Sequence, residues 1–350
     1  MSDAVATVGI DIGKTTFHLI GFDQRGAIVL RQKVSRAQLE RRFAALPPCL
    51  VGMEACCGAR HVGRRLAALG HEVRSIPAQF VKPFVESNKN DFRDAEAVAE
   101  AVAEAVLRPT MRFVPLKSRE QLDLQALHRV RQRLVGERTA VINQIRGFVL
   151  EHGITVRSGP PALRRALPEI VANQHGVLSP GMAQLLLDLD DDWRRLDDRT
   201  EEVTRAIEEI AKRDEACRRL MTIPGVGPIV SSAMVAAIGD GAAFAKARDF
   251  GAWLGLVPKQ VSTGDRTLLR GISKRGNRYL RTMFIQGARS VLLRRVTWAN
   301  HSFGRWLEAA APRLHRNVLA AALANKLARI AWSVLTRGGA YTRTPDARPA

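Results

Sequence analysis

Alternation of apolar and polar residues marks three short strands at the start of the chain. The strands are predicted at residues 6–13, 17–22 and 26–34, with turn-forming residues 23–26 between the last two. The apolar spacing then becomes helical, because Leu39, Phe43 and Leu46 share one face, and the pair Pro47-Pro48 ends this helix.

Helices and strands alternate over the next part of the chain. A strand at residues 50–54, a helix at 60–69, a strand at 73–76 and an alanine-rich helix at 91–106 follow in turn. Three hairpin-like strands followed by alternating helices and strands are the pattern of a ribonuclease H-like fold. We therefore expect an α/β RNase H-like domain over residues 1–117.

Long helices dominate the middle of the chain. Residues 121–150 are amphipathic, and a Pro/Gly-rich break at residues 158–161 separates them from a charged helix at 185–211. Apolar residues of this second helix recur at roughly heptad spacing: Leu189, Trp193, Leu196, Val203, Ile207 and Ile210. A coiled-coil arm and a plain antiparallel helical hairpin fit this pattern equally well. We assign residues 118–215 to a helical linker and arm.

Charge distinguishes the last third from the rest of the chain. The 350 residues have a net charge of +20, although a hydrophobic fraction of 46% and a charged fraction of 25% are those of an ordinary globular protein. Residues 216–350 hold 22 Lys and Arg against five Asp and Glu, so +17 of the +20 lies there. Such concentration indicates a surface for a polyanion, most commonly nucleic acid. We expect a mainly helical basic domain here, ending in a helix at 316–337.

Composition also limits where the protein works and how it binds. The N-terminus lacks a charged segment followed by an apolar one, and no apolar run reaches about 18 residues, so we expect a cytoplasmic protein without a membrane span. The cysteines show neither zinc spacing nor a disulfide framework, and adjacent Cys56 and Cys57 are expected in a core or at a strand end. Aromatic residues make up 5%, so contacts to a nucleic-acid backbone should outweigh base stacking.

Four acidic residues of the α/β domain are candidates for a metal site. Asp11 interrupts an apolar strand and Glu54 ends another, where a carboxylate is costly to bury unless it is paired or metal-bound. Asp91 and Asp94 lie three residues apart at the start of a helix and share one face. Clustered carboxylates repel one another unless a divalent cation neutralises them, and oxygen ligands suit Mg²⁺ or Mn²⁺. Taken singly, Asp91 could instead cap its helix and Glu54 could lie on the surface.

A phosphate-binding loop is a second interpretation of the first strand. Residues 9–16, Gly-Ile-Asp-Ile-Gly-Lys-Thr-Thr, resemble the first phosphate loop of actin-like sugar kinases and ATPases, which share the same core fold. Those proteins need a second glycine-rich loop much later in the chain. The nearest candidate, residues 238–241, follows a helical segment, so we rank a kinase lower.

The basic domain contains a glycine-rich hairpin and a cluster of cations. Residues 222–228, Thr-Ile-Pro-Gly-Val-Gly-Pro, resemble the hairpin of helix-hairpin-helix DNA-binding modules, where Gly225 and Gly227 would let backbone N–H groups approach a phosphate. Seven later residues can bind phosphate oxygens: Lys259, Arg266, Arg270, Lys274, Arg275, Arg278 and Arg281. The simpler interpretation of most of these cations is a solvated face.

The order of these motifs resembles one family along almost the whole chain. The motifs are residues 9–14 (Gly-Ile-Asp-Ile-Gly-Lys), 53–55 (Met-Glu-Ala), 88–96 (Asn-Lys-Asn-Asp-Phe-Arg-Asp-Ala-Glu), 223–227 (Ile-Pro-Gly-Val-Gly) and 255–276, which begins Gly-Leu-Val-Pro. Together they resemble the transposases of the IS110 insertion-sequence family, relatives of the Piv-type DNA invertases. The combination is highly specific, although several of the motifs alone are not.

The resemblance implies a mechanism. Family members pair a RuvC-like domain bearing an Asp-Glu-Asp-Asp set with a transposase domain bearing a nucleophilic serine. They form a covalent phosphoserine–DNA intermediate, are guided by a bridge RNA, and assemble as multimers, here a dimer or a tetramer, through a helical arm. Carried over, the four metal ligands are Asp11, Glu54, Asp91 and Asp94.

The position of the nucleophile is open between two neighbouring residues. An alignment anchored on Gly264 selects Thr263, whereas the residue type that attacks selects Ser262. A primary hydroxyl attacks phosphorus with less steric hindrance than a secondary one, which favours Ser262. A lone serine beside a glycine is otherwise an ordinary turn residue.

Two functions of different classes remain. A recombinase would use the acidic residues for metal, Ser262 for attack on DNA, and RNA for the choice of sequence. The alternative is a non-catalytic, basic nucleic-acid-binding protein. The complete acidic set favours the recombinase, because a binding protein has no need of four carboxylates that repel phosphate. We expect a catalytic centre assembled from both ends of the chain, within one chain or across two.

Overall fold

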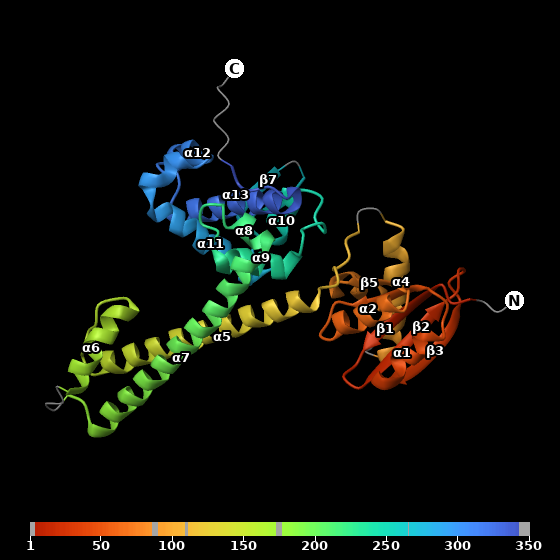
Figure 1. Cartoon of the computed structure of the whole chain (residues 1–350), viewed down its shortest axis with the longest axis horizontal. Helices are drawn as coiled ribbons and strands as arrows, with labels where there is room; N and C mark the ends of the chain where they lie inside the picture. The colour runs from red at the N-terminus through yellow and green to blue at the C-terminus, as the bar shows by residue number, and fades with distance from the viewer. Residues whose placement is uncertain (1–3, 86–89, 109–110, 173–176, 265, 343–350) are drawn as a thin grey trace, which may run out of the picture. The chain divides into compact units, whose positions relative to one another are not determined.

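The computed structural model describes residues 4–85, 90–108, 111–172, 177–264 and 266–342 (Figure 1). The chain divides into two compact units, Met1–Ser118 and Arg119–Ala350. The first is mixed α/β and the second is mostly helical, so the predicted fold class is confirmed at this level. A further division of the second unit at residue 216 stays a prediction.

The first unit is built on a five-stranded sheet of order β3-β2-β1-β4-β5. Its strands are β1 (Thr7–Ile12), β2 (Thr16–Phe22), β3 (Ile28–Ser35), β4 (Leu50–Glu54) and β5 (Glu72–Ile76). β1, β2 and β3 form an antiparallel meander, while β4 runs parallel to β1 and β5 parallel to β4. All five strands lie at the predicted positions.

Helices cover both faces of this sheet. They are α1 (Arg36–Ala44), α2 (Ala59–Ala68), α3 (Ala78–Val81), the 3-10 helix η1 (Lys82–Phe84) and α4 (Asp91–Val106). Phe43 of α1 and Leu66 of α2 are fully buried in one core with Val8 and Ile10 of β1. Ala95 and Ala99 of α4 instead pack with residues of β2 on the opposite face.

Two glycines let α4 lie directly on the sheet. Gly9 of β1 and Gly52 of β4 are register partners, and a Cβ atom at Gly9 would clash with the carbonyl oxygen of Ala95. A Cβ atom at Gly52 would lie 2.6 Å from a methyl carbon of Val102. Because side chains alternate along a strand, the residues two positions beyond these glycines project from the face that α4 covers.

The second unit begins with two long helices that lie side by side (Figure 1). They are α5 (Arg119–Glu151) and α7 (Pro180–Arg213), and α6 (Pro160–Ala172) packs against them near one end. The contact is made within one chain, as in the helical-hairpin interpretation of the sequence.

The buried face of α7 differs in phase from the predicted one. Trp193, Val203 and Ile207 are buried as expected, but Leu189 and Leu196 are only partly buried and Ile210 is exposed. The other buried positions are Ala183, Leu186, Asp190, Thr200 and Ala211. Because polar residues occupy some of the buried positions, the spacing of apolar residues alone predicted the wrong buried face for α7.

Seven further helices are found among the described residues of the C-terminal part of the second unit. They are α8 (Glu215–Leu220), α9 (Pro228–Ile238), α10 (Ala247–Trp253), α11 (Arg278–Leu293), the 3-10 helix η2 (Arg295–Asn300), α12 (Gly304–Ala310) and α13 (Arg316–Arg337). Phe250, Phe284 and Leu327 are fully buried in their shared core.

α13 is the one described helix that is long and apolar enough to cross a membrane. The sequence had indicated no such run. Half of the apolar window of α13 is nevertheless buried inside the unit, where the helix packs on α10 and α11. Its apolar character therefore matches that of a core helix.

A two-stranded hairpin interrupts these helices and was not predicted. β6 (Pro258–Thr263) and β7 (Arg266–Ile272) pair in antiparallel register. Both strands are exposed along almost their whole length, and Leu269 is 63% exposed. Neither face of the hairpin is buried, so the sequence carries no alternation by which these strands could be found.

Candidate active site

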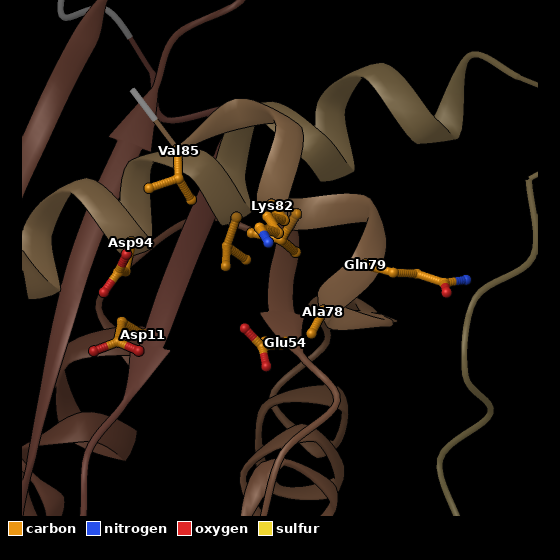
Figure 2. Close-up of a pocket in the computed structure, with 9 residues that line it drawn as sticks. Asp11, Glu54, Ala78, Gln79, Lys82, Val85 and Asp94 are labelled. Atoms are coloured by element: carbon orange, nitrogen blue, oxygen red, sulfur yellow. The ribbon is translucent and has the colours of Figure 1, made fainter. Parts of the chain in front are cut away.

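Two predicted acids lie side by side at the ends of neighbouring strands. Ile10 of β1 pairs with Met53 of β4, so the next residues, Asp11 and Glu54, end up adjacent on the face covered by α4. Both side chains are partly buried. Figure 2 shows their carboxylates turned toward one space.

The first turn of α4 carries the other two acids, Asp91 and Asp94. The Asn90 side chain caps this helix by accepting a hydrogen bond from the Phe92 backbone N–H at 3.0 Å, so Asp91 is not the cap. Asp94 lies one turn into the helix and faces Asp11 and Glu54 (Figure 2). Residues 88 and 89 of the family motif lie outside the described residues.

Asp11, Glu54 and Asp94 line a cavity of about 460 Å³. Its other lining residues come from the segment after β5 and from α4: Ala78, Gln79, Val81, Lys82, Val85 and Val98. Lys82 was not predicted, and it supplies the cationic side chain of this lining. A cavity with three carboxylates and one ammonium group suits a cation together with a phosphate group.

Asp91 lies on the other side of Asp11, beside a histidine that sequence reasoning missed. His18 of β2 is the register partner of Asp11, and its Nδ1 lies 3.6 Å from Oδ2 of Asp91. Donor atoms of Asp11, His18 and Asp91 all lie within 4.8 Å of one another, which is close enough for one metal ion. The signal in the sequence was the short β1–β2 hairpin, which places residue 18 opposite residue 11.

The charges around Asp11 act on its protonation. Burial raises the pKa of this carboxyl above its ordinary value, and the negative charges of Asp91 and Asp94 raise it further. His18 opposes this effect, while Glu54 adds to it. All four predicted acids therefore interact in one cluster centred on Asp11, and a divalent cation would relieve their repulsion.

The two candidate nucleophiles lie on the exposed β6–β7 hairpin. Ser262 pairs with Thr267 and Thr263 with Arg266, so their side chains project from opposite faces. Nε2 of Gln260 donates to Oγ of Ser262 at 2.8 Å, and Oγ1 of Thr267 lies 3.4 Å from the same oxygen. Among the described residues, no carboxylate or imidazole hydrogen-bonds Ser262.

Two family models match the chain. A model of the DEDD transposases of the IS110 type matches residues 8–154, and the model described as "Transposase IS116/IS110/IS902 family" matches residues 217–303. The first range contains the acidic cluster and the second contains the hairpin with Ser262.

Curated relatives are similar over nearly the whole chain. The transposase for insertion sequence element IS1328 of Yersinia enterocolitica is 43% identical over 339 residues, 97% of this chain and 99% of the relative. A probable family 20 transposase of Pseudomonas aeruginosa is 44% identical over 96% of this chain and 98% of the relative. The transposase for element IS1111A of Coxiella burnetii is 41% identical over 96% and 91%.

The chain belongs to the IS116/IS110/IS902 family of transposases. Transposases of this family cut and rejoin DNA, so the non-catalytic alternative is set aside. The kinase alternative is set aside by the same family membership.

Six of the seven predicted phosphate-binding cations of the transposase are exposed. They are Lys259, Arg266, Arg270, Lys274, Arg275 and Arg278. Within the described part of the chain, none of the six forms an ion pair with a carboxylate. Their charge is therefore available to a polyanion.

Arg281 does not match its predicted role, and Gly225 has a packing role that was not predicted. Arg281 is 8% exposed, and its Nη1 donates to the carbonyl oxygens of Leu254 at 2.8 Å and of Arg275 at 2.9 Å. Gly225 has φ +79° and packs backbone to backbone on Gly287 of α11, where a Cβ atom would lie 2.6 Å from the Gly287 oxygen. Both residues support the fold, whereas Gly227, at the start of α9, stays open.

The adjacent cysteines lie at a strand end, which is one of the two expected places, and they are exposed rather than in a core. Cys56 and Cys57 follow β4 in an exposed turn, whereas Cys49 and Cys217 are buried. The turn is fixed by the backbone, since the Cys56 N–H donates to the Glu54 carbonyl at 2.8 Å. It belongs to the end of the strand that carries Glu54.

Proposed function

We propose that the transposase cuts and rejoins DNA by combining a divalent-metal site at Asp11, Glu54, Asp91 and Asp94 with a serine nucleophile at Ser262. The observation that carries this proposal is the convergence of the four acids on Asp11. The strand order β3-β2-β1-β4-β5, with the first acid on the central strand, supports an RNase H-like fold for the first unit.

The chemistry of the donor atoms fits Mg²⁺ or Mn²⁺. Asp11 lies between two groups of side chains, Glu54 with Asp94 on one side and His18 with Asp91 on the other. Its carboxylate can therefore contribute a metal ligand to either group. Such ions activate the attacking oxygen and stabilise the leaving oxygen in phosphoryl transfer. The protein contributes the positions of its carboxylates, which are set by the ends of β1 and β4 and by the first turn of α4.

Ser262 is the better of the two candidate nucleophiles. Its hydroxyl is held on one face of the hairpin by Gln260 and Thr267, whereas no side-chain hydrogen bond of Thr263 occurs among the described residues. In the first step the Oγ–P bond forms and one P–O bond of the DNA backbone breaks. The serine proton leaves and the departing DNA oxygen is protonated. In the second step a DNA hydroxyl attacks the phosphoserine, restores a phosphodiester and frees the serine.

The exposed cations around the hairpin would hold the DNA backbone. Lys259, Arg266 and Arg270 belong to β6 and β7, and Lys274, Arg275 and Arg278 follow directly. Phosphate contacts of this kind orient DNA without selecting its sequence. A bridge RNA would supply sequence choice, and a dimer or tetramer working in the cytoplasm completes this proposal, by resemblance to the family.

The metal role is tested by single substitutions of the acids. We expect Asp11→Ala or Asp94→Ala to abolish strand exchange while DNA binding survives, because the carboxylates act on chemistry rather than on affinity. Glu72→Gln is the matched control, since Glu72 is an exposed acid of the neighbouring β5 that pairs with Arg74. Strand exchange retained by both aspartate variants would refute the metal role.

The nucleophile is tested by trapping the covalent intermediate. Ser262→Ala should prevent a protein–DNA adduct that survives denaturation, and Thr263→Ala should leave the adduct in place. An adduct that persists in Ser262→Ala and disappears in Thr263→Ala would transfer the role to Thr263. Both residues are exposed, so neither substitution disturbs a core.

A further inference from the structure

His18 is a buried histidine beside the acidic cluster. It lies on β2 directly opposite Asp11 and is 6% exposed. Directly opposed residues of an antiparallel pair project from the same face, so His18 and Asp11 share the face covered by α4. The ring of Phe92, in the first turn of α4, contacts the His18 ring edge-on at 4.7 Å between centroids.

The Nδ1 atom of His18 is buried without a hydrogen-bond partner among the described residues. A buried polar atom left in this state costs about 1 to 3 kcal/mol, so a partner is expected in the working protein. Its nearest charged neighbour is Oδ2 of Asp91, at 3.6 Å. That separation is too long for a good hydrogen bond. It fits two ligand atoms on adjacent sides of one ion, each bonded at about 2.1 Å.

The spacing of the donor atoms fits a shared cation. Ligand atoms on opposite sides of one ion lie about 4 to 5 Å apart. The donor atoms of Asp11, His18 and Asp91 lie within 4.8 Å of one another. An imidazole that binds through Nδ1 carries its proton on Nε2, so the neutral ring is a competent ligand.

We propose that His18 Nδ1 is a ligand of the cation held by Asp11 and Asp91, and that this nitrogen makes the position selective for Mn²⁺ over Mg²⁺. The inference rests on the metal site of the proposed function. Mg²⁺ takes oxygen ligands and sheds its water reluctantly, whereas transition ions accept imidazole nitrogen together with carboxylate. The group of Asp11, Glu54 and Asp94 contains only carboxylate ligands and should discriminate less between the two ions.

A spectroscopic measurement on the full chain tests the ligand directly. We expect pulsed EPR of the Mn²⁺-loaded protein to show coupling of the ion to an imidazole ¹⁴N nucleus. His18→Phe keeps an aromatic ring against Phe92 but removes the nitrogen, so the coupling should disappear. His71→Phe, at a buried histidine of the same unit that bonds Cys49 and Phe43, is the control that should keep it.

Calorimetric titration with Mn²⁺ and, separately, with Mg²⁺ tests the selectivity. We expect His18→Phe to weaken Mn²⁺ binding at least about tenfold and Mg²⁺ binding less than about threefold. Glu54→Gln should weaken both ions alike. An unchanged ratio of the two affinities in His18→Phe, or wild-type protein without ¹⁴N coupling, would overturn the role of His18.

These outcomes separate the two proposals. Wild-type protein that binds neither ion, or binding that Asp11→Asn leaves intact, contradicts the metal site itself. Normal binding that Asp11→Asn removes, combined with no effect of His18→Phe, contradicts only the histidine ligand. If His18→Phe does not fold, the wild-type ¹⁴N coupling still decides the question.

Discussion

Arg275 and Arg281 belong to the same basic segment but do different things. Arg275 is exposed, whereas the Arg281 guanidinium is buried and donates to backbone carbonyls at the end of α10 and in the loop before α11. Two arginines six residues apart thus differ in role: Arg281 supports the fold, whereas Arg275 stays exposed to solvent. The division follows burial, which charge counting along a sequence does not reveal.

His128 illustrates a buried polar residue that joins helices. Its Nδ1 lies 3.0 Å from the hydroxyl of Tyr279 on α11, and its Nε2 lies 3.1 Å from Oγ of Ser232 on α9. Burial lowers the pKa of His128 to about 4, and the positive charge of Arg131 contributes to the same shift. The imidazole therefore stays neutral in the folded protein at neutral pH.

This lowered pKa predicts a loss of stability in mild acid. Between pH 6.5 and about pH 4 the unfolded chain binds a proton at His128 that the folded chain does not, so the free energy of unfolding falls as the pH falls. From pH 7 to pH 5 the loss should be about 2 kcal/mol larger in the wild type than in His128→Gln. Urea unfolding followed by tryptophan fluorescence measures it, because all five tryptophans lie in the second unit.

The comparison contains its own control. Between pH 8 and pH 9, well above the ordinary histidine pKa of about 6.5, His128 is neutral in both states, so the two proteins should respond to pH identically. Equal acid sensitivity of the wild type and the variant between pH 7 and pH 5 would show that another group titrates.

The residues of the acidic cluster could be predicted, but its full membership could not. Asp11 and Glu54 were found because a carboxylate in an apolar strand is costly to bury, and Asp91 and Asp94 because they share one face at a helix start. His18 raised no such conflict, since a histidine in a strand is unremarkable by itself. Its proximity to Asp11 depends on the β1–β2 register, and its proximity to Asp91 depends on how α4 packs.

At the scale of elements, the site depends on the close approach of α4 to the sheet. Gly52 leaves space for Val102, and Gly9 leaves space for the backbone at Ala95. The two contacts differ in kind, because a side chain can be trimmed and a backbone carbonyl cannot. Substitutions at these glycines should therefore move α4, the helix that carries Asp94. A second substitution should restore the position of α4 in the Gly52 variant but not in the Gly9 variant.

We predict that Gly52→Ala weakens metal binding without changing any acidic residue. The new Cβ would lie 2.6 Å from a methyl carbon of Val102, so α4 must shift, at a cost of about 1 to 3 kcal/mol in stability. Val102→Ala removes that methyl group, and the double variant should recover part of both losses. Calorimetric Mn²⁺ titration and thermal unfolding of the four proteins measure the coupling.

Gly9→Ala provides the contrasting case. Its Cβ would meet the carbonyl oxygen of Ala95 and the backbone nitrogen of Ala99, so no single side-chain truncation relieves it. Recovery of Gly9→Ala by Val102→Ala, or no recovery of Gly52→Ala, would mean that the two contacts do not act separately.

Which elements could be predicted follows from burial. The five strands of the sheet and α4 pack against a core and carry a clear pattern. The β6–β7 hairpin buries neither face, so its sequence has no alternation of apolar and polar residues that would predict strands. The predicted buried face of α7 was wrong because Asp190 is buried while Ile210 is exposed. Asp190 is tolerated there because Arg194 donates to it at 2.6 and 2.8 Å.

At the scale of the whole molecule, the charge is unevenly distributed. Residues 216–350 carry +17 of the net +20, and their exposed cations include those around the hairpin. The long helices α5 and α7 are also rich in arginine, but many of these arginines are paired with acids of the same helix. Examples are Arg133 with Glu137, Arg199 with Glu202 and Arg205 with Glu201.

This contrast predicts which cations set the salt dependence of DNA binding. Replacing Lys274, Arg275 and Arg278 by Gln should reduce the slope of log K against log salt by about 2 to 3, because about 0.9 is lost for each phosphate contact. Replacing Arg133, Arg199 and Arg205 by Gln removes the same charge and should leave the slope nearly unchanged. Fluorescence anisotropy of a labelled DNA duplex, titrated at several salt concentrations from about 50 to about 200 mM, measures the slope for each triple variant.

Equal slopes for the two triple variants would mean that total charge, rather than the surface near the hairpin, governs binding. A smaller slope for the arm variant alone would place the DNA on α5 and α7 instead.

The exposed hairpin also has a consequence for how the polypeptide could be divided. The core of the second unit joins Phe250 of α10, before the hairpin, to Phe284 of α11 and Leu327 of α13, after it. A break after Gly264 would therefore leave both fragments with large apolar surfaces that only the other fragment covers. Two separately produced pieces should reassemble, so recombination could be made to depend on bringing two halves of one protein together.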